Sequence, residues 1–295
     1  MIRAYHVHSQ YEQKQHDVLL NELEEYLRTK YNAEIINKTG EVIFVNNKVI
    51  VSDCDLLIEY VNENIFKGIT FADNDSSFLS FFKERNNPED ILLTSQYNEQ
   101  NIKSSESMCK LKKSIYITAS PKIDIDYYYN KRQEIKEYKD KFYFRGNINA
   151  VGRTTVPLLL NSPYFEGGDS INYTQYFEEL INYKVGLCIP GVGEFCYRDI
   201  EYMGIGIPMI KFEYLNELHY PLIPNYHYIS IDRIGDVVSE RNGTDEHSNA
   251  YIKRFLEVKD DKEFLDFISK NAREYYENYL HESTRLNKII ELLEI

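Results

Sequence analysis

Two patterns of apolar and polar residues, one typical of helices and one typical of strands, alternate along the first half of the chain. Residues 13–30 repeat apolar side chains at helical spacing, which predicts an amphipathic helix. Short apolar runs bounded by turn residues predict strands instead. The predicted strands are 2–7, 56–61, 68–71, 91–95 and 114–118, with a hairpin over 41–51 and helices over 76–85 and 127–139. Strands that alternate with helices favour a mainly parallel sheet with helices on both faces.

The second half repeats this alternation. Residues 185–189 are continuously apolar, which is typical of a strand buried on both faces. Residues 236–248 are polar and predict a surface loop. The other predicted strands are 141–144, 208–212 and 228–231, and the predicted helices are 154–160, 173–183, 196–203, 261–280 and 284–293.

These two halves predict an α/β protein with two Rossmann-like domains that face each other across a cleft. The length of 295 residues fits two domains at roughly 150 residues each. The first domain is assigned to residues 1–139 and the second to 140–270, and residues 271–295 form a C-terminal helix expected to pack back on the first domain. Ligands of such sheets bind at the carboxyl ends of the strands.

The net charge and the cysteine content limit which binding partners and which cellular compartment are expected for the protein. The formal net charge is −13, and a protein this acidic repels nucleic-acid backbones, so no nucleic-acid partner is expected. The basic cluster of Lys110, Lys112 and Lys113 is interpreted as a solvated turn before a strand. The four cysteines form no C-x-x-C pair and are expected to be free thiols in a reducing compartment. No signal peptide and no apolar run of roughly 18 residues is visible, which predicts a cytoplasmic protein or a piece of a longer membrane-anchored one.

The most informative segment covers residues 184–212 and reads KVGLCIPGVGEFCYRDIEYMGIGIPMIKF. A buried strand ends at Pro190, and Gly191 and Gly193 allow close approach of a ligand to the backbone. The helix that follows directs its free N–H groups at the same place, which favours an anion such as phosphate. Arg198 and Glu201 share one face of that helix. They suit a diphosphate and the hydroxyls of a ribose, and the alternative is an ordinary salt bridge within the helix.

This segment resembles the nucleotide-binding segment of glycosyltransferases with the GT-B fold, most of all the exostosin-type group. The resemblance implies that Arg198 contacts the donor diphosphate and Glu201 the ribose. Two departures are visible: Cys196 or Tyr197 replaces a small hydroxyl residue of the family, and Glu194 lies seven positions from Glu201 where retaining enzymes often have eight. The matching residues are Lys184, Gly186, Leu187, Cys188, Gly191, Gly193, Arg198, Glu201, Gly206, Pro208 and Ile210.

A second cluster follows the predicted strand 141–144. Arg145 and Arg153 stand where the same families place phosphate-binding arginines, and they are expected to stabilise the leaving diphosphate without a metal. The alternative is two surface arginines in a loop. The predicted donor-binding residues are Arg145, Asn147, Arg153, Gly193, Glu194, Tyr197, Arg198 and Glu201.

An inverting transferase also needs a base that deprotonates the acceptor hydroxyl. Asp73 directly follows the predicted strand 68–71, and His8 follows the first strand. The alternatives are an N-cap or Asx-turn for Asp73 and a surface imidazole for His8. Because no third ligand stands at a defined spacing from His6 and His8, no metal site is expected. Asp124, in an Asp-x-Asp sequence, suits a helix cap better than a metal.

The sequence thus predicts a glycosyltransferase that moves a sugar from a nucleotide diphosphate donor to the hydroxyl group of a glycan or glycoconjugate. UDP and GDP sugars are the favoured donors, and no cofactor is expected. Two alternatives stay open: a nucleotide-sugar epimerase on the same fold, and a non-catalytic module that binds the nucleotide-sugar or a glycan.

Overall fold

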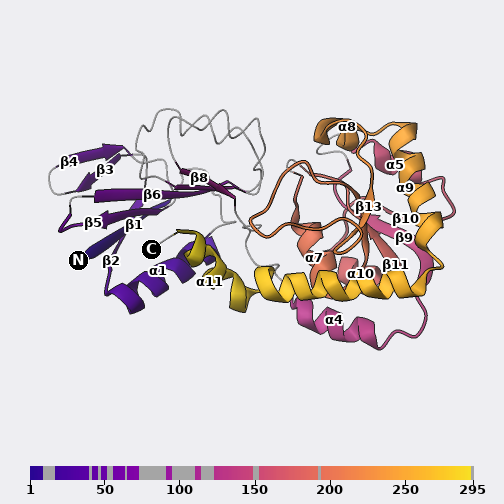
Figure 1. Cartoon of the computed structure of the whole chain (residues 1–295), viewed down its shortest axis with the longest axis horizontal. Helices are drawn as coiled ribbons and strands as arrows, with labels where there is room; N and C mark the ends of the chain where they lie inside the picture. The colour runs from indigo at the N-terminus through magenta and orange to yellow at the C-terminus, as the bar shows by residue number, and fades with distance from the viewer. Residues whose placement is uncertain are drawn as a thin grey trace. The chain divides into compact units, whose positions relative to one another are not determined.

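The computed structural model divides into two compact units, each with its own sheet (Figure 1). Unit 1 comprises Met1–Ser120, Asn216–His219 and Arg285–Ile295, and unit 2 comprises Pro121–Leu215 and Tyr220–Thr284. No helix in the described part of the chain is long and apolar enough to cross a membrane. The described residues are 1–8, 17–39, 42–45, 48–51, 56–63, 65–72, 91–94, 110–113, 123–148, 153–191 and 194–293.

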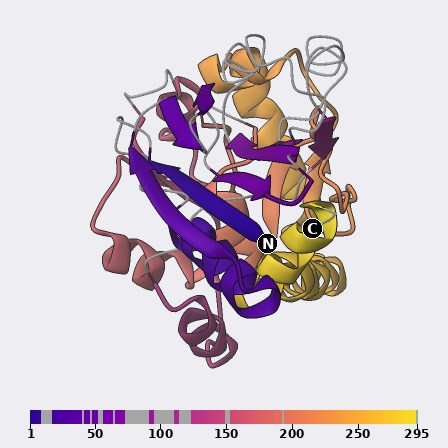
Figure 2. The ribbon, with the colours of Figure 1, turned by 90° about the vertical axis from the view of Figure 1, so that its left-hand side faces the viewer.

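Unit 1 contains a six-stranded sheet in the order β2-β1-β5-β6-β7-β8. Helix α1 (Asp17–Tyr31) runs beside β1 and β2 (Figure 2). The strands are β1 (Ile2–His8), β2 (Glu34–Thr39), β5 (Leu56–Tyr60), β6 (Ile65–Ala72), β7 (Ile91–Thr94) and β8 (Lys110–Lys113), and β3 (Val42–Val45) and β4 (Lys48–Val51) form the predicted hairpin.

The sheet of unit 1 is mixed: three of its five neighbouring pairs are parallel, as predicted for most of the sheet, and two are antiparallel. The antiparallel pairs are β1 with β5 and β5 with β6. Only a short turn separates β5 from β6, and a parallel pair of these two strands would need a long crossover. The basic cluster at Lys110, Lys112 and Lys113 is strand β8 itself and not a turn before a strand. Residues 34–39 form a strand that the sequence analysis did not predict. The predicted helix over residues 76–85 lies outside the described residues.

Unit 2 contains a five-stranded sheet in the order β10-β9-β11-β12-β13, and every neighbouring pair is parallel. The α/β class predicted for this half is therefore confirmed. The strands are β9 (Lys139–Arg145), β10 (Phe165–Gly168), β11 (Tyr183–Leu187), β12 (Met209–Phe212) and β13 (Ile229–Ile231). The helices are α4 (Ile125–Gln133), α5 (Thr155–Leu159), α6 (Tyr173–Leu180), α7 (Tyr197–Ile205), α8 (Val237–Asn242), α9 (Asp245–Val258), α10 (Lys262–Tyr275) and the π-helix η1 (Tyr276–Leu280). Helix α11 (Glu282–Leu293) begins at the end of unit 2, and from Arg285 onward it belongs to unit 1.

Three features of unit 2 differ from the expectation or refine it. Residues 236–248 are not a loop but form α8 and the start of α9. The domain boundary expected after residue 139 falls inside unit 2, because α4 packs on α7 and the Arg132 side chain donates to the Ile181 carbonyl at 2.6 Å. The expected cap is confirmed: Asp124 accepts a hydrogen bond from the Tyr127 N–H at 2.8 Å at the start of α4.

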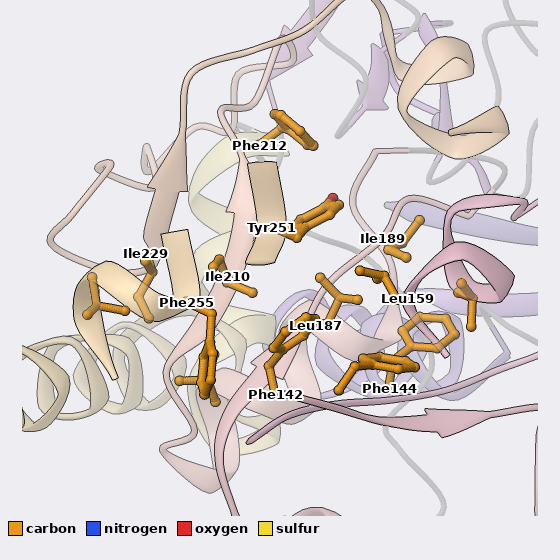
Figure 3. Packing of buried hydrophobic residues seen from close by; sticks show 14 of the residues in the cluster. Phe142, Phe144, Leu159, Leu187, Ile189, Ile210, Phe212, Ile229, Tyr251 and Phe255 are labelled. Atoms are coloured by element: carbon orange, nitrogen blue, oxygen red, sulfur yellow. The ribbon is translucent and has the colours of Figure 1, made fainter. Parts of the chain in front are cut away.

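The two faces of this sheet have different cores. Phe142 and Phe144 in β9 point into an aliphatic and phenylalanine cluster together with Leu187, Ile210 and Phe255 (Figure 3). The residue between them, Tyr143, points to the opposite face because side chains alternate along a strand. On that face, the ring of Tyr143 stacks on Tyr183 at 4.3 Å and on Tyr176 at 6.2 Å. Three of the 26 tyrosines therefore pack together on this face of the sheet.

Gly186 lets helix α7 approach strand β11 closely on this tyrosine face. A Cβ atom placed on Gly186 would lie 2.6 Å from Cε2 of Tyr202. That ring cannot move away easily, since its hydroxyl donates to the carbonyls of Leu187 (3.2 Å) and Tyr143 (3.3 Å). We expect Gly186→Ala to lower the free energy of unfolding by about 1–3 kcal/mol.

Urea unfolding followed by circular dichroism measures this cost, and a double-variant cycle tests its cause. In a Tyr202→Leu background, which removes the ring, Gly186→Ala should cost clearly less. An equal cost in both backgrounds would show that the contact with Tyr202 is not responsible.

Candidate functional site

The order of the strands in unit 2 identifies one edge of the sheet as the place for a ligand. From β9 the chain moves to β10 on one side, and from β11 it moves to β12 and β13 on the other. In open parallel sheets, the crevice at the carboxyl ends of the two strands where the direction reverses is where ligands bind. Here these strands are β9, which ends at Arg145, and β11, which is followed by Cys188 to Gly191.

Helix α7 begins at this edge. Cys196 precedes it with extended backbone angles, and its N–H donates to the side chain of Asp199 at 2.8 Å. The helix ends at Gly206, whose φ of 69° lies in the left-handed region that glycine adopts without strain. The free N–H groups of the first turn make this end of the helix favourable for an anion.

Arg198 lies in the first turn of α7 and reaches back to the end of β9. Its guanidinium carbon lies 4.2 Å from the centre of the Phe144 ring, and Nη2 donates to the Arg145 carbonyl at 2.7 Å. Its Nε is buried and has no hydrogen-bond partner among the described residues. A buried donor of a cationic side chain without a partner is costly, and a ligand oxygen at this point would satisfy it.

Arg153 reaches the same place from the segment that follows β9. It donates from Nε to the Pro190 carbonyl at 3.1 Å and from Nη1 to the Asn147 carbonyl at 3.3 Å, and so links the loops after β11 and β9. A Cβ atom on Gly146 would lie 2.7 Å from Nη2 of Arg198 and 3.2 Å from Nη1 of Arg153. Two guanidinium groups therefore converge on Gly146, which has no side chain.

Arg145 does not converge with them. Its side chain turns towards α6 and pairs with Glu179 at 3.2 Å, and the same carboxylate accepts a hydrogen bond from the Tyr143 hydroxyl at 2.8 Å. What Arg145 presents to Arg198 is its backbone carbonyl. Its guanidinium is thus engaged on the tyrosine face.

Glu201 is buried, and each of its carboxylate oxygens accepts a hydrogen bond from a tyrosine of α6. Tyr173 donates to Oε1 and Tyr176 donates to Oε2 at 3.0 Å. Burial raises the pKa of Glu201, although the tyrosine hydroxyls and the Arg198 charge act in the opposite direction. No ion pair joins Arg198 to Glu201, both of which the structure describes, so the simple salt bridge within the helix is not formed.

A fully buried lysine, Lys211, contacts the first turn of α7 and the segment that precedes it. Lys211 in β12 lies with Nζ 2.9 Å from Oδ1 of Asp199, and it donates to the Glu194 carbonyl at 2.6 Å. Burial works against the charge of Asp199, but Lys211, Cys196 and Tyr214 outweigh it, so the pKa of Asp199 is lowered. This pair holds the β11 to α7 connection against the sheet.

The other predicted donor-binding residues differ in their burial and in their contacts. The carboxylate of Glu194 is completely buried and is held by Arg233 and by the Leu215 N–H at 2.9 Å, which gives it a supporting part within the fold. Asn147 is exposed, and Tyr197 is partly exposed in the first turn of α7. Gly193 lies outside the described residues.

The two candidates for the base lie in unit 1. Asp73 lies outside the described residues. His8 is the last residue of β1 and pairs in register with Thr39 of β2, and only its backbone is described. Both stay predictions.

Comparison with known proteins adds to the description of the fold. No protein-family model and no curated protein matches the chain. Solved structures do match. The GtfA/B complex is 11% identical with a TM-score of 0.36 over 86% of this chain and 62% of that one. The C-terminal domain of a glycosyl transferase group 1 family protein from Francisella tularensis is 9% identical, with a TM-score of 0.32 over 56% of this chain and 95% of that one.

A further match is HepE from Anabaena in complex with UDP-glucose, at 12% identity and a TM-score of 0.46, over 77% of this chain and 71% of that one. This chain spans less than two thirds of the length of the GtfA/B structure. At such identities a likeness concerns the fold alone, and the chemistry rests on the residues of this chain.

The sequence analysis singled out Arg198, Arg153 and Glu201. It did not single out the tyrosines that bind Glu201 or the buried lysine beside the start of α7. Tyr173 and Tyr176, which bind Glu201, come from a different helix and carry no motif. Lys211 could have been found, because a charged residue inside the apolar run 208–212 signals a buried ion pair.

Proposed function

We propose that unit 2 binds the diphosphate of a nucleotide-sugar and that the protein is a glycosyltransferase. The observation that carries this proposal is the convergence of Arg153 and Arg198 on Gly146, where the parallel sheet reverses its strand order and α7 begins. The resemblance of residues 184–212 to exostosin-type enzymes supports the same conclusion. Cationic side chains and a helix N-terminus suit a leaving diphosphate, because charge develops on it as the bond to the sugar breaks.

In this proposal Arg198 contacts the diphosphate through its buried Nε, and the N–H groups of the first turn of α7 assist it. Arg153 adds charge while it holds the loops after β9 and β11 together. The acceptor oxygen forms the new bond to the sugar, and its proton passes to a base, for which Asp73 and His8 are the candidates. The donor is a UDP or GDP sugar, the acceptor is a hydroxyl group of a glycan or glycoconjugate, and the reaction needs no metal.

The ribose contact proposed for Glu201 requires a rearrangement. Both of its oxygens already accept hydrogen bonds from tyrosines, and Tyr173 is 40% exposed whereas Tyr176 is buried. A ribose hydroxyl would therefore share or replace the hydrogen bond from Tyr173.

Calorimetric titration of the full chain with UDP, GDP, ADP and dTDP tests the proposal. We expect one nucleotide to bind, and Arg198→Met to weaken that binding about 10- to 100-fold, as the loss of a charge-assisted hydrogen bond should. Methionine retains an apolar contact with Phe144, and circular dichroism checks the fold. Arg254→Ala, which removes a guanidinium of α9 paired with Glu257, is the matched control and should not change the affinity.

Two outcomes would contradict the proposal. One is that no nucleotide binds, with or without added Mg²⁺. The other is that Arg198→Met and Arg254→Ala bind equally well. If a nucleotide binds, release of the sugar from the matching donor separates a transferase or epimerase from a module that only binds, and the identity of the product separates transfer from epimerisation.

A further inference from the structure

Two cysteine thiols meet directly beneath the connection between β11 and α7. Cys188 follows β11 and is buried, and Cys196 immediately precedes α7 and is partly exposed. Their Sγ atoms lie within 4.8 Å of each other and of a carboxylate oxygen of Asp199. A disulfide has a bond of about 2.05 Å, so the two side chains must bring their sulfur atoms closer together for the bond to form.

A metal ion is a poor occupant of this cluster, because the ammonium of Lys211 already lies beside two of its three groups. Its ammonium lies 2.9 Å from Asp199 and 3.8 Å from the sulfur of Cys188, so a second cation would meet a buried positive charge. Structural zinc sites also use four ligands, and the cluster in the described part of the chain offers three.

The surroundings give the two thiols different reactivity. The hydrogen bond from the Cys188 thiol lowers the pKa of Cys196, and the charges of Arg198 and Lys211 add to this effect against burial and the Asp199 carboxylate. Burial raises the pKa of Cys188. A thiolate at a helix N-terminus beside a second thiol is the usual arrangement of an oxidisable cysteine and its resolving partner.

We propose that Cys188 and Cys196 form a reversible disulfide when the protein meets a peroxide. The thiolate of Cys196 attacks one peroxide oxygen, the O–O bond breaks, and the second oxygen leaves as water after taking up a proton. Cys196 is then a sulfenic acid. The sulfur of Cys188 attacks the sulfur of Cys196, the S–O bond breaks, and a second water leaves with the proton of Cys188. Two thiols lose two electrons, and the peroxide gains them.

The proposed bond closes a ring over residues 188–196, which contains the whole connection between β11 and α7. It also removes the hydrogen bond from the Cys196 thiol to Asp199 at 3.0 Å. Formation of the disulfide depends on the positions of the two thiols and does not require that the neighbouring edge bind a nucleotide.

Free-thiol counting and peptide mass spectrometry of the full chain test the proposal. A Cys54→Ser/Cys109→Ser variant leaves only the two cysteines in question. Treated with hydrogen peroxide as a monomer, it should lose both free thiols and yield one cross-linked peptide pair that contains Cys188 and Cys196. Dithiothreitol should restore both thiols.

Two further variants show which cysteine reacts with the peroxide and which one completes the disulfide. With Cys188→Ser added, the reaction should stop at a sulfenic acid on Cys196, which dimedone traps, and with Cys196→Ser added the remaining thiol should react far more slowly. Persistence of both thiols in the two-cysteine protein, a disulfide only between two chains, or first reaction at Cys188 would each overturn the proposal. Protection of the thiols by stoichiometric Zn²⁺ would assign the cluster to a metal instead.

Discussion

Replacing Lys211 by methionine is expected to lower the free energy of unfolding by about 3–5 kcal/mol. Lys211 is fully buried, and its ammonium serves both the carboxylate of Asp199 and the carbonyl of Glu194. Methionine fills most of the same volume, but it leaves the Asp199 charge in the core without its cation. Removal of one member of a buried pair is costly because the remaining charge cannot reach water and keeps only uncharged hydrogen-bond partners, here Cys196 and Tyr214.

Urea unfolding followed by circular dichroism measures this loss. The matched control is Lys262→Met, which removes an exposed lysine paired with Asp266 at 2.8 Å and should change the stability by at most about 1 kcal/mol. Adding Asp199→Asn to Lys211→Met should recover part of the loss, since it removes the stranded charge. Similar small changes for Lys211→Met and Lys262→Met would refute the role given to this pair.

Glu240 is expected to make the free energy of unfolding depend strongly on pH. Its carboxyl is completely buried, accepts a hydrogen bond from the Tyr251 hydroxyl at 2.9 Å and pairs with Arg233 at 3.1 Å. Burial raises its pKa from 4.5 to about 7, with Glu194 acting in the same direction and with Lys211, Arg233 and Tyr251 opposing. The folded protein therefore retains a proton that the unfolded chain releases.

The sign follows from proton linkage. Between pH 4.5 and 7 the folded state binds more protons at Glu240 than the unfolded state does, so the contribution of this residue to stability falls as the pH rises. The decrease amounts to about 3 kcal/mol across this window. Below pH 4.5 the carboxyl is neutral in both states, and above pH 7 it is ionised in both, so the contribution is constant there.

Glu240→Gln should remove this contribution. The difference in unfolding free energy between the variant and the wild type should shift by about 3 kcal/mol in favour of the variant from pH 4.5 to 7. Glu257→Gln, which changes an exposed glutamate of α9, provides the control and should give a difference that is flat with pH. A flat difference for Glu240→Gln as well would mean that its carboxyl ionises as readily in the folded protein as in the unfolded chain.

The sequence was most informative where strands are buried on both faces. β11 and β12 were predicted because parallel strands under two layers of helices require continuous apolar runs. β10 was missed because it has four residues, two of them glycines. Helix α8 and the start of α9 were missed because residues 236–248 are polar, although Asp236 caps α8 through the Ser239 N–H at 2.7 Å.

The candidate site was predicted in its backbone framework but not in its side-chain pairs. Gly191 lies between β11 and α7, and Arg198 lies in the first turn of α7, and such spacing is visible in a sequence. The pairing of Arg145 with Glu179, and of Glu201 with Tyr173, joins residues 34 and 28 positions apart. Contacts between different elements follow no period in the sequence. They can therefore be identified only in the folded structure.

The all-parallel sheet of unit 2 also has a kinetic consequence. Neighbouring parallel strands need a long crossover, so β9 cannot pair with β10 or β11 until the chain between them has closed. Closing such loops before contacts form is slow, and the hydrogen bond from Arg198 to the Arg145 carbonyl spans 53 residues. The edge where the two guanidinium groups meet is therefore expected to assemble late in folding, and a newly made chain would bring Arg153 and Arg198 together only after the central strands of unit 2 have come together.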